Sequence, residues 1–263
     1  MQISKIKNLF FLFSLVLLIS SCSKEEDPTA PETPEEPTPT LTITSNATLG
    51  NIVTDEEGRT LYFFSKDVAG NSECEGGCLT NWPAYYEVDL EAGTGVDAAA
   101  IGVITRADGS KQNTLNGWPL YYFSGDSQPG NTNGEGLGGN WFVAKTNYSM
   151  MIGETTIDDE PTQYLTDGNG QTLYIFTVDT ENVSNCSDGC LSSWPPFFSS
   201  DIIIPSTIDA SKFGEIDGNN GSKQLVFNAQ PLYYFASDQN RGDVNGQGAG
   251  GNWFVLKDTD LSN

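Results

Sequence analysis

The chain has 263 residues, and its 35 acidic side chains against 12 basic ones give a formal net charge of −23 at neutral pH. This charge excludes a protein that binds nucleic acid through a basic surface. The absence of histidine excludes a serine–histidine–aspartate catalytic triad.

Residues 1–21 have the organisation of an export signal, with two lysines followed by an apolar run over residues 9–19. This run is too short to cross a bilayer, because a spanning helix needs about 20 apolar residues. An ordinary secretory signal is one interpretation. The pair of serines directly before Cys22 resembles a lipobox, and this resemblance implies a lipoprotein signal, with cleavage before Cys22 and a lipid anchor on that residue.

Residues 22–40 form an acidic, proline-rich segment that has too few apolar residues to build a core, so we expect a disordered linker. Its first residues, Ser-Lys-Glu-Glu-Asp, resemble the export signal of lipoproteins displayed on the surface of the bacterial outer membrane. The alternative is that they are only the solvated start of the linker. We therefore expect an outer-membrane protein, held by its N-terminal lipid and exposed on the cell surface.

The rest of the chain is an internal repeat with an offset of 112 residues. Residues 60–83 recur as 172–195, and a shorter stretch, 119–126, recurs as 231–238. The repeat predicts two homologous modules, 41–148 and 152–263, each containing two half-repeats.

Short β-branched and aromatic runs between Gly, Asn and Asp clusters predict strands throughout both modules. The expected hairpins join 51–54 to 60–64, 101–106 to 111–115, 163–166 to 172–176, and 215–216 to 223–227. Closing strands are expected at 141–145 and 253–257, and no stretch has convincing helical periodicity. The fold class is therefore all-β, with two tandem modules resembling a β-meander or a small sandwich. In residues 61–64, alternation places Tyr62 and Phe64 on one face of the strand and Leu61 and Phe63 on the other. Because both faces are apolar, we expect other parts of the chain to cover both.

Each module contains one pair of cysteines separated by three residues, Cys74 with Cys78 and Cys186 with Cys190. In an exported protein such even pairs predict local disulfides. A zinc site would need four ligands, whereas each module offers two thiols and no histidine. A redox dithiol would favour the Cys-x-x-Cys spacing, which is absent.

Two glycine-rich loops, residues 126–140 and 238–252, carry oxygen-bearing side chains in an order that partly matches a calcium-binding loop. The weak candidates for metal ligands are Asp126, Asn131, Asn133, Glu135, Asp238, Asp243 and Asn245. A calcium loop needs an acidic residue at its twelfth position. Counted from Asn131 and Asp243, that position is occupied by Phe142 and Phe254. The favoured interpretation is a connection whose Asn and Asp side chains cap turns, and we assign no metal or other cofactor.

A signature of the form Tyr-x-Phe-x-x-Asp occurs once in each half-repeat. Its members are Tyr62, Phe64 and Asp67; Tyr121, Phe123 and Asp126; Tyr174, Phe176 and Asp179; and Tyr233, Phe235 and Asp238. An aspartate just beyond a strand usually caps a turn, and no base or nucleophile lies beside these in the sequence. A glycosidase-type pair of catalytic carboxylates is an alternative role for these aspartates, because the distance between two carboxyl groups in the fold is not readable from the sequence.

Together with the Cys-x3-Cys-Leu-x-x-Trp-Pro motif and the closing Gly-Asn-Trp-Phe-Val, these signatures resemble the family of predicted bacterial lipoproteins with a Tyr-x-[Phe/Trp/Tyr]-x-x-Asp motif, also described as secreted repeats of unknown function. The resemblance implies a secreted or lipid-anchored tandem β-repeat and supplies no activity. We expect a non-enzymatic binding or scaffolding element that is attached to the membrane and has an envelope protein or a glycan as partner. The alternative is a redox or calcium-binding accessory protein of the envelope.

Overall fold

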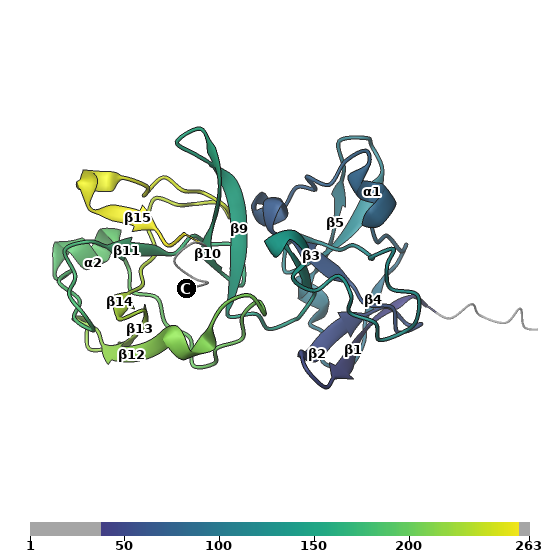
Figure 1. Ribbon diagram of the computed structural model, residues 1–263, viewed down its shortest axis with the longest axis horizontal. Coiled ribbons are helices and arrows are strands. Elements are labelled where there is room, and N and C mark those ends of the chain that lie inside the picture. The colour runs from purple at the N-terminus through teal and green to yellow at the C-terminus, as the bar shows by residue number, and fades with distance from the viewer. Residues whose placement is uncertain (1–37, 258–263) are drawn as a thin grey trace, which may run out of the picture. The chain divides into compact units, whose positions relative to one another are not determined.

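Strands make up most of the regular structure, and the helices are short (Figure 1). The computed structural model describes residues 38–257. The prediction of an all-β chain built from tandem repeated modules is confirmed.

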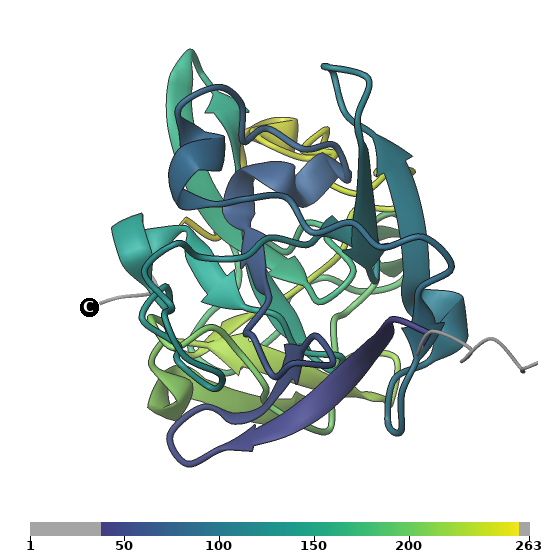
Figure 2. The same ribbon diagram turned by 90° about the vertical axis from the view of Figure 1, so that its right-hand side faces the viewer.

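The first module has eight strands in the described part of the chain. They are β1 (Thr40–Asn46), β2 (Gly50–Thr54), β3 (Tyr62–Phe64), β4 (Glu91–Ala92), β5 (Ile101–Thr105), β6 (Lys111–Leu115), β7 (Trp118–Pro119) and β8 (Trp141–Val143). They form the sheets β2-β1-β4, β3-β8 and β5-β6-β7, and Figure 2 shows the long purple strand β1 with β2 beside it.

The second module repeats this arrangement. Its strands are β9 (Met150–Ile157), β10 (Glu160–Asp167), β11 (Tyr174–Phe176), β12 (Phe213–Asp217), β13 (Lys223–Phe227), β14 (Gln230–Pro231) and β15 (Trp253–Val255). The sheets β10-β9, β11-β15 and β12-β13-β14 match their counterparts, except that β4 has no equivalent among the described strands of the second module. The repeat in the sequence is therefore a repeat of topology.

Short helices occupy the connections. The α-helices are α1 (Cys78–Asn81) and α2 (Gly189–Ser193), and the 3₁₀ helices are η1 (Ser65–Ala69), η2 (Ala98–Ala100), η3 (Leu137–Gly139), η4 (Ala210–Lys212) and η5 (Ala249–Gly251).

Two expected hairpins, 51–54 with 60–64 and 163–166 with 172–176, have different partners in the structure. In the second module β10 pairs with β9 and β11 pairs with β15, and a bridge joins Thr166 to Thr172. Strand β2 pairs along its length with β1, whereas β3 pairs with the closing strand β8. The link from β2 toward β3 is reduced to a bridge between Thr54 and Thr60. The physical reason is that β1 supplies a longer antiparallel partner for β2. The expected pairing of 101–106 with 111–115 matches β5 with β6, which join Ile101 to Leu115.

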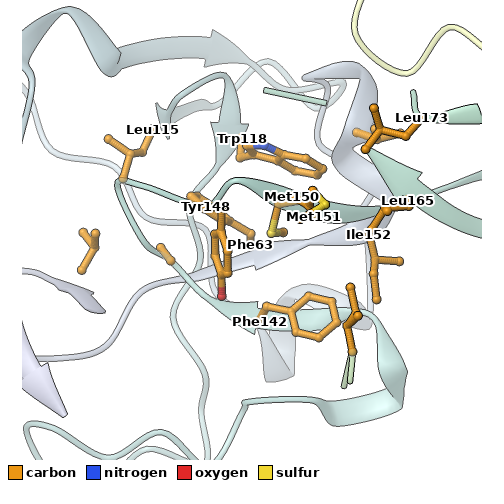
Figure 3. Close-up of a cluster of buried hydrophobic side chains, with 14 of the residues drawn as sticks. Phe63, Leu115, Trp118, Phe142, Tyr148, Met150, Met151, Ile152, Leu165 and Leu173 are labelled. Atoms are coloured by element: carbon orange, nitrogen blue, oxygen red, sulfur yellow. The ribbon is translucent and has the colours of Figure 1, made fainter. Parts of the chain in front are cut away.

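The alternation predicted for residues 61–64 is confirmed by two separate clusters of buried side chains. Tyr62 and Phe64 belong to a cluster within the first module, whereas Leu61 and Phe63 belong to a larger core cluster. Figure 3 shows part of the larger cluster, in which Phe63 lies among aromatic and aliphatic side chains. Strand β3 is thus covered on both faces.

The larger cluster includes side chains from both modules, among them Trp118, Met150 and Leu173 (Figure 3). The indole N–H of Trp118 donates to the carbonyl oxygen of Gly168 at 2.9 Å. In return, Arg241 reaches from the second module and donates to the carbonyl oxygens of Val68 (2.6 Å) and Asn116 (2.9 Å). The two modules therefore share buried apolar surface and partly buried hydrogen bonds.

Candidate functional site

In each module, the signature tyrosines of the two half-repeats form an antiparallel backbone bridge with each other. The backbone N–H of Tyr62 donates to the carbonyl oxygen of Tyr121 at 2.8 Å, and the N–H of Tyr121 donates back at 3.1 Å. Tyr174 and Tyr233 form the same pair at 2.8 and 3.0 Å. Equivalent residues of two half-repeats therefore meet at the centre of each module.

The phenols of these tyrosines cross to the signature aspartates of the opposite half-repeat. The hydroxyl of Tyr62 donates to Asp126 Oδ2 at 2.5 Å, and that of Tyr121 donates to Asp67 Oδ2 at 2.6 Å. In the second module Tyr174 donates to Asp238 (2.6 Å) and Tyr233 donates to Asp179 (2.7 Å). Hydrogen bonds to a carboxylate are stronger than those between neutral groups, so these pairs fasten the half-repeats together.

The second carboxylate oxygen of each signature aspartate holds the backbone of the loop that follows it. Asp67 Oδ1 accepts from the N–H of Glu73 at 2.7 Å, and Asp126 Oδ1 accepts from the N–H of Asn133 at 2.9 Å. The equivalent bonds run from Asn185 to Asp179 (2.6 Å) and from Asn245 to Asp238 (3.0 Å). All four aspartates thus engage both oxygens, which is the turn-capping role favoured by the sequence.

Burial changes the acid–base properties of these groups. Burial raises the pKa of Asp67 to about 7, although the hydrogen bonds from Tyr121 and from the backbone of Glu73 oppose the rise. Burial likewise raises the pKa of Asp179 and of Asp238. The pKa of Tyr121 is also raised, first by burial and then by the nearby Asp67, so the phenol remains a donor at neutral pH.

The phenylalanine of each signature ends a stack of four aromatic rings. In the first module, ring centroids are 4.0 Å apart from Phe64 to Trp141, 3.8 Å from Trp141 to Trp82 and 4.4 Å from Trp82 to Phe123. In the second module Phe176, Trp253, Trp194 and Phe235 stack in the same order at 4.2, 3.8 and 4.2 Å. We call each stack an aromatic column.

The signature tyrosines touch the tryptophans of the column with their ring edges. The centroids of Tyr62 and Trp82 are 5.4 Å apart, and those of Tyr121 and Trp141 are 5.1 Å apart, both in T-shaped contact. Edge-to-face packing of this kind is favourable beyond simple burial. Within the protein the aromatic residues therefore pack against one another.

The glycine-rich loop of each module lies against its column. A side chain at Gly134 would come within 2.8 Å of both Trp82 and Tyr62, and the N–H of Gly134 donates to the Tyr62 hydroxyl at 3.3 Å. Gly246 has the same relationship to Tyr174 and Trp194. Glycine is required here because the backbone approaches the aromatic rings closely.

Each cysteine pair forms a disulfide, Cys74 with Cys78 and Cys186 with Cys190. The carbonyl oxygen of Cys74 accepts a hydrogen bond from Arg106 at 2.6 Å. In the second module Asn219 donates to the carbonyl oxygen of Cys186 at 2.8 Å. The disulfide loops are thus fixed by different donors in the two modules, and the sequence did not identify Arg106 or Asn219.

The weak candidates for calcium ligands make hydrogen bonds within the protein, either through their side chains or through their backbone N–H groups. Asn131 Oδ1 accepts from the backbone of Gln128, and Glu135 Oε2 accepts from the backbone of Val143 at 2.6 Å. Asp243 Oδ2 accepts from two backbone N–H groups, and the roles of Asp126, Asn133, Asp238 and Asn245 are given above. Within residues 38–257 there is no group of three or more His, Cys, Asp or Glu side chains that could hold a metal ion.

A hollow of about 230 Å³ opens at the Phe123 end of the first column. Its lining residues are Arg59, Thr60, Pro83, Tyr122, Phe123 and Asp126. The guanidinium of Arg59 lies 4.3 Å from the centre of the Tyr122 ring, and its side chain is half exposed. We call this feature the Arg59 pocket.

The cation in the Arg59 pocket is already neutralised by carboxylates. Arg59 Nε donates to Asp55 Oδ2 at 2.7 Å, and the hydroxyl of Tyr122 donates to the same oxygen at 2.7 Å. Glu57 lies 3.3 Å from the guanidinium. The pocket therefore combines an aromatic wall with polar groups whose net charge is not positive, and sequence reasoning missed it because these residues converge only in space.

Cys22 and the export signal lie outside the described residues. In the part of the chain that the structure covers, no helix has the length and apolar character needed to cross a membrane.

The model of a family described as a secreted repeat of unknown function matches residues 43–85, 102–145, 155–197 and 214–257, one half-repeat in each case. No curated protein and no solved structure matches the chain.

Proposed function

The chain belongs to this family of secreted repeats of unknown function, and on that premise we propose that it is a non-enzymatic binding element displayed on the bacterial surface by a lipid on Cys22. The observation that carries the proposal is that all four signature aspartates engage both carboxylate oxygens in hydrogen bonds that hold the fold together. A catalytic carboxylate must have an oxygen within reach of its substrate. The signature is therefore better suited to building a scaffold than to acting on a bound substrate.

The location is supported by the sequence before the modules. A cysteine directly after an export signal, followed by an acidic, proline-rich stretch, suits a lipid anchor with a spacer. Two or more acyl chains hold a protein stably on a membrane, whereas one chain binds reversibly. The outer leaflet of the outer membrane is the proposed location, because of the acidic residues that follow Cys22.

The ligand proposed for the Arg59 pocket is a neutral saccharide. Binding sites of this kind combine apolar and aromatic walls with a few polar groups that fix orientation. Phe123 and Pro83 offer apolar faces, while the half-exposed Arg59 offers a hydrogen-bond donor. An anionic ligand is disfavoured, because Asp55 and Glu57 already surround the guanidinium.

The second module supplies a natural control. In the repeat register, Gln171 stands at the position of Arg59, whereas Thr172, Pro195, Tyr234, Phe235 and Asp238 preserve the other lining residues. The change Arg59→Gln therefore converts the first pocket to the composition of the second. Since Arg59 is half exposed, this change should leave the fold intact.

Two experiments test the proposal. Metabolic labelling with a fatty acid should label the native protein and fail for Cys22→Ala, and protease added to intact cells should digest the labelled protein. The acylated protein in detergent, screened against an array of neutral bacterial glycans, should bind a subset of them. Arg59→Gln and Phe123→Leu should weaken that binding, and Phe235→Leu should not. An unlabelled protein would contradict the anchor, and binding that is unchanged by both first-module variants would contradict the pocket.

A further inference from the structure

The aromatic columns have a geometry that suits one-electron chemistry. Aromatic pairs in proteins usually have centroids 4.5–7 Å apart, in offset or edge-to-face arrangements. The tryptophan pair in each column is closer, at 3.8 Å, and its planes lie within 2° of parallel in the first module and 1° in the second. Face-to-face contact allows the two indole π systems to share a missing electron, which lowers the energy needed to remove one.

Each tryptophan pair is flanked by tyrosines that have a built-in proton acceptor. A phenol becomes a strong acid when it loses an electron, so its oxidation is much easier when a base can take the proton. Tyr62 and Tyr121 donate to Asp126 and Asp67 at 2.5 and 2.6 Å, and both touch the column in T-shaped contact. Burial raises the pKa of Asp67 to about 7, which makes it a better acceptor than an ordinary carboxylate.

The column is shielded along its length but reaches the surface at one end. Trp82, Trp141, Tyr62 and Tyr121 are buried, which protects a radical from reaction with solvent components. Phe123 is only partly buried and lines the Arg59 pocket. An oxidant at this end would be separated from the tryptophan pair by one ring, whose centroid is 4.4 Å from that of Trp82.

We propose that each aromatic column is a radical relay that receives an oxidising equivalent at the protein surface and stores it on a buried tyrosine. A strong one-electron oxidant, of the class of radicals derived from peroxide, takes one electron from the tryptophan pair. The pair is restored by one electron from Tyr121, whose proton moves along the existing hydrogen bond to Asp67. The products are a neutral tyrosyl radical, a protonated Asp67 and the oxidant reduced by one electron, so charge and atoms balance. In the second module Trp194, Trp253, Tyr233 and Asp179 take the same roles.

This inference is independent of the saccharide proposed above. It gives the repeated signature a chemical use: the phenylalanine ends the column, the tyrosine holds the radical and the aspartate holds the proton.

The test is flash photolysis of the full mature protein, at a pH above 7 where Asp67 is ionised, with photogenerated tris(bipyridine)ruthenium(III) as the oxidant. Transient absorption should show a tryptophanyl signal that decays as a long-lived tyrosyl signal appears, and electron paramagnetic resonance of frozen samples should identify that tyrosyl radical. The double variant Tyr121→Phe and Tyr233→Phe keeps both ring contacts but removes these two phenols, so the tryptophanyl signal should persist longer and the tyrosyl yield should fall to the part carried by Tyr62 and Tyr174. The double variant Asp67→Asn and Asp179→Asn should slow the transfer and abolish its dependence on deuterated solvent.

Tyr86→Phe is the matched control, because Tyr86 is an exposed tyrosine outside the column. This variant should reproduce the wild-type signals. The double variant at Tyr121 and Tyr233 must retain the wild-type circular dichroism spectrum, and if it does not, the aspartate variants carry the test. Equal tyrosyl yield and lifetime in the wild-type protein and in the folded variants would overturn the relay and leave the columns with a packing role alone.

Discussion

The indole N–H of Trp118 donates to the carbonyl oxygen of Gly168 at 2.9 Å, which joins the first module to the second through a fully buried side chain. In the repeat register the counterpart of Trp118 is Gln230, and the counterpart of Arg241 is Pro129. Trp118 and Arg241 lie in contact, with the guanidinium 4.7 Å from the centre of a Trp118 ring. The joint between the modules is therefore built at positions where the two copies differ.

The change Trp118→Gln should loosen this joint. Loss of a buried tryptophan typically costs about 3–5 kcal/mol when it is truncated, and the hydrogen bond to Gly168 is lost as well. We expect a lower melting temperature and the replacement of one cooperative transition by two in differential scanning calorimetry. The control Arg59→Gln also installs the residue of the other copy, but on the surface. A single transition at the wild-type temperature in Trp118→Gln would contradict the shared core.

Much of the repeat's internal organisation is readable from sequence, because it depends on local patterns. The offset of 112 residues, the paired cysteines and the alternation of residues 61–64 are all local signals, and each has its counterpart in the structure. Strand β1 also has a local signal, because Leu41 and Ile43 alternate with threonines, although it is not among the strands expected above.

The remaining features depend on contacts between residues far apart in the chain. Neither the crossing of Tyr62 to Asp126 nor the meeting of Arg59 with Tyr122 leaves a periodic trace in the sequence. The contact between the modules does have a signal in the sequence, because the first module has Trp118 where the second module has Gln230. Differences between internal repeats therefore indicate where the repeats touch each other.

The stability of the protein should fall as the pH rises from about 4 to 7. Burial raises the pKa of Asp67 from an ordinary value of 3.8 to about 7, so the folded protein keeps a proton that the unfolded chain releases in this range. The free energy of unfolding therefore decreases with increasing pH, by about 1.4 kcal/mol for each unit of pKa difference at most. Asp167, Asp179 and Asp238 have raised pKa values as well and act in the same direction.

Urea denaturation at a series of pH values measures this effect. Asp67→Asn should flatten the pH dependence, because the group that titrates is removed. Asp108→Asn should leave the slope unchanged, since the Asp108 carboxylate is fully exposed and its contacts with Ser110 lower its pKa. A slope that Asp67→Asn does not alter would show that this carboxylate titrates normally in the folded protein.

Reduction of the two disulfides should weaken the protein without unfolding it. A ring closed by cysteines four residues apart restricts the unfolded chain modestly, by about 2 kcal/mol according to loop entropy. Scanning calorimetry with and without a phosphine reductant should therefore show a lower melting temperature and a folded protein at room temperature. Complete unfolding on reduction would mean that the disulfides stabilise much more than their own loops.

Gly134→Ala should destabilise the first module through a steric clash. The added methyl group would lie 2.8 Å from Trp82 and from Tyr62, both of which are packed in the core, and overpacking of this kind costs about 1–3 kcal/mol. Gly77→Ala is the matched control, because Gly77 has ordinary helical dihedral angles and no atom near its Cβ position. Chemical denaturation of both variants should separate them, and equal stability would contradict the close approach of the loop.

The central claim is that the signature fastens one half-repeat to the other, and a double-mutant cycle on unfolding free energies tests it most directly. Tyr62→Phe combined with Asp126→Ala should give a coupling energy of about 1 kcal/mol or more, as expected for residues in direct contact. Tyr62→Phe combined with Asp67→Ala, the aspartate of its own half-repeat, should give a much smaller one. Strong coupling of Tyr62 to Asp67, with none to Asp126, would contradict the crossed arrangement.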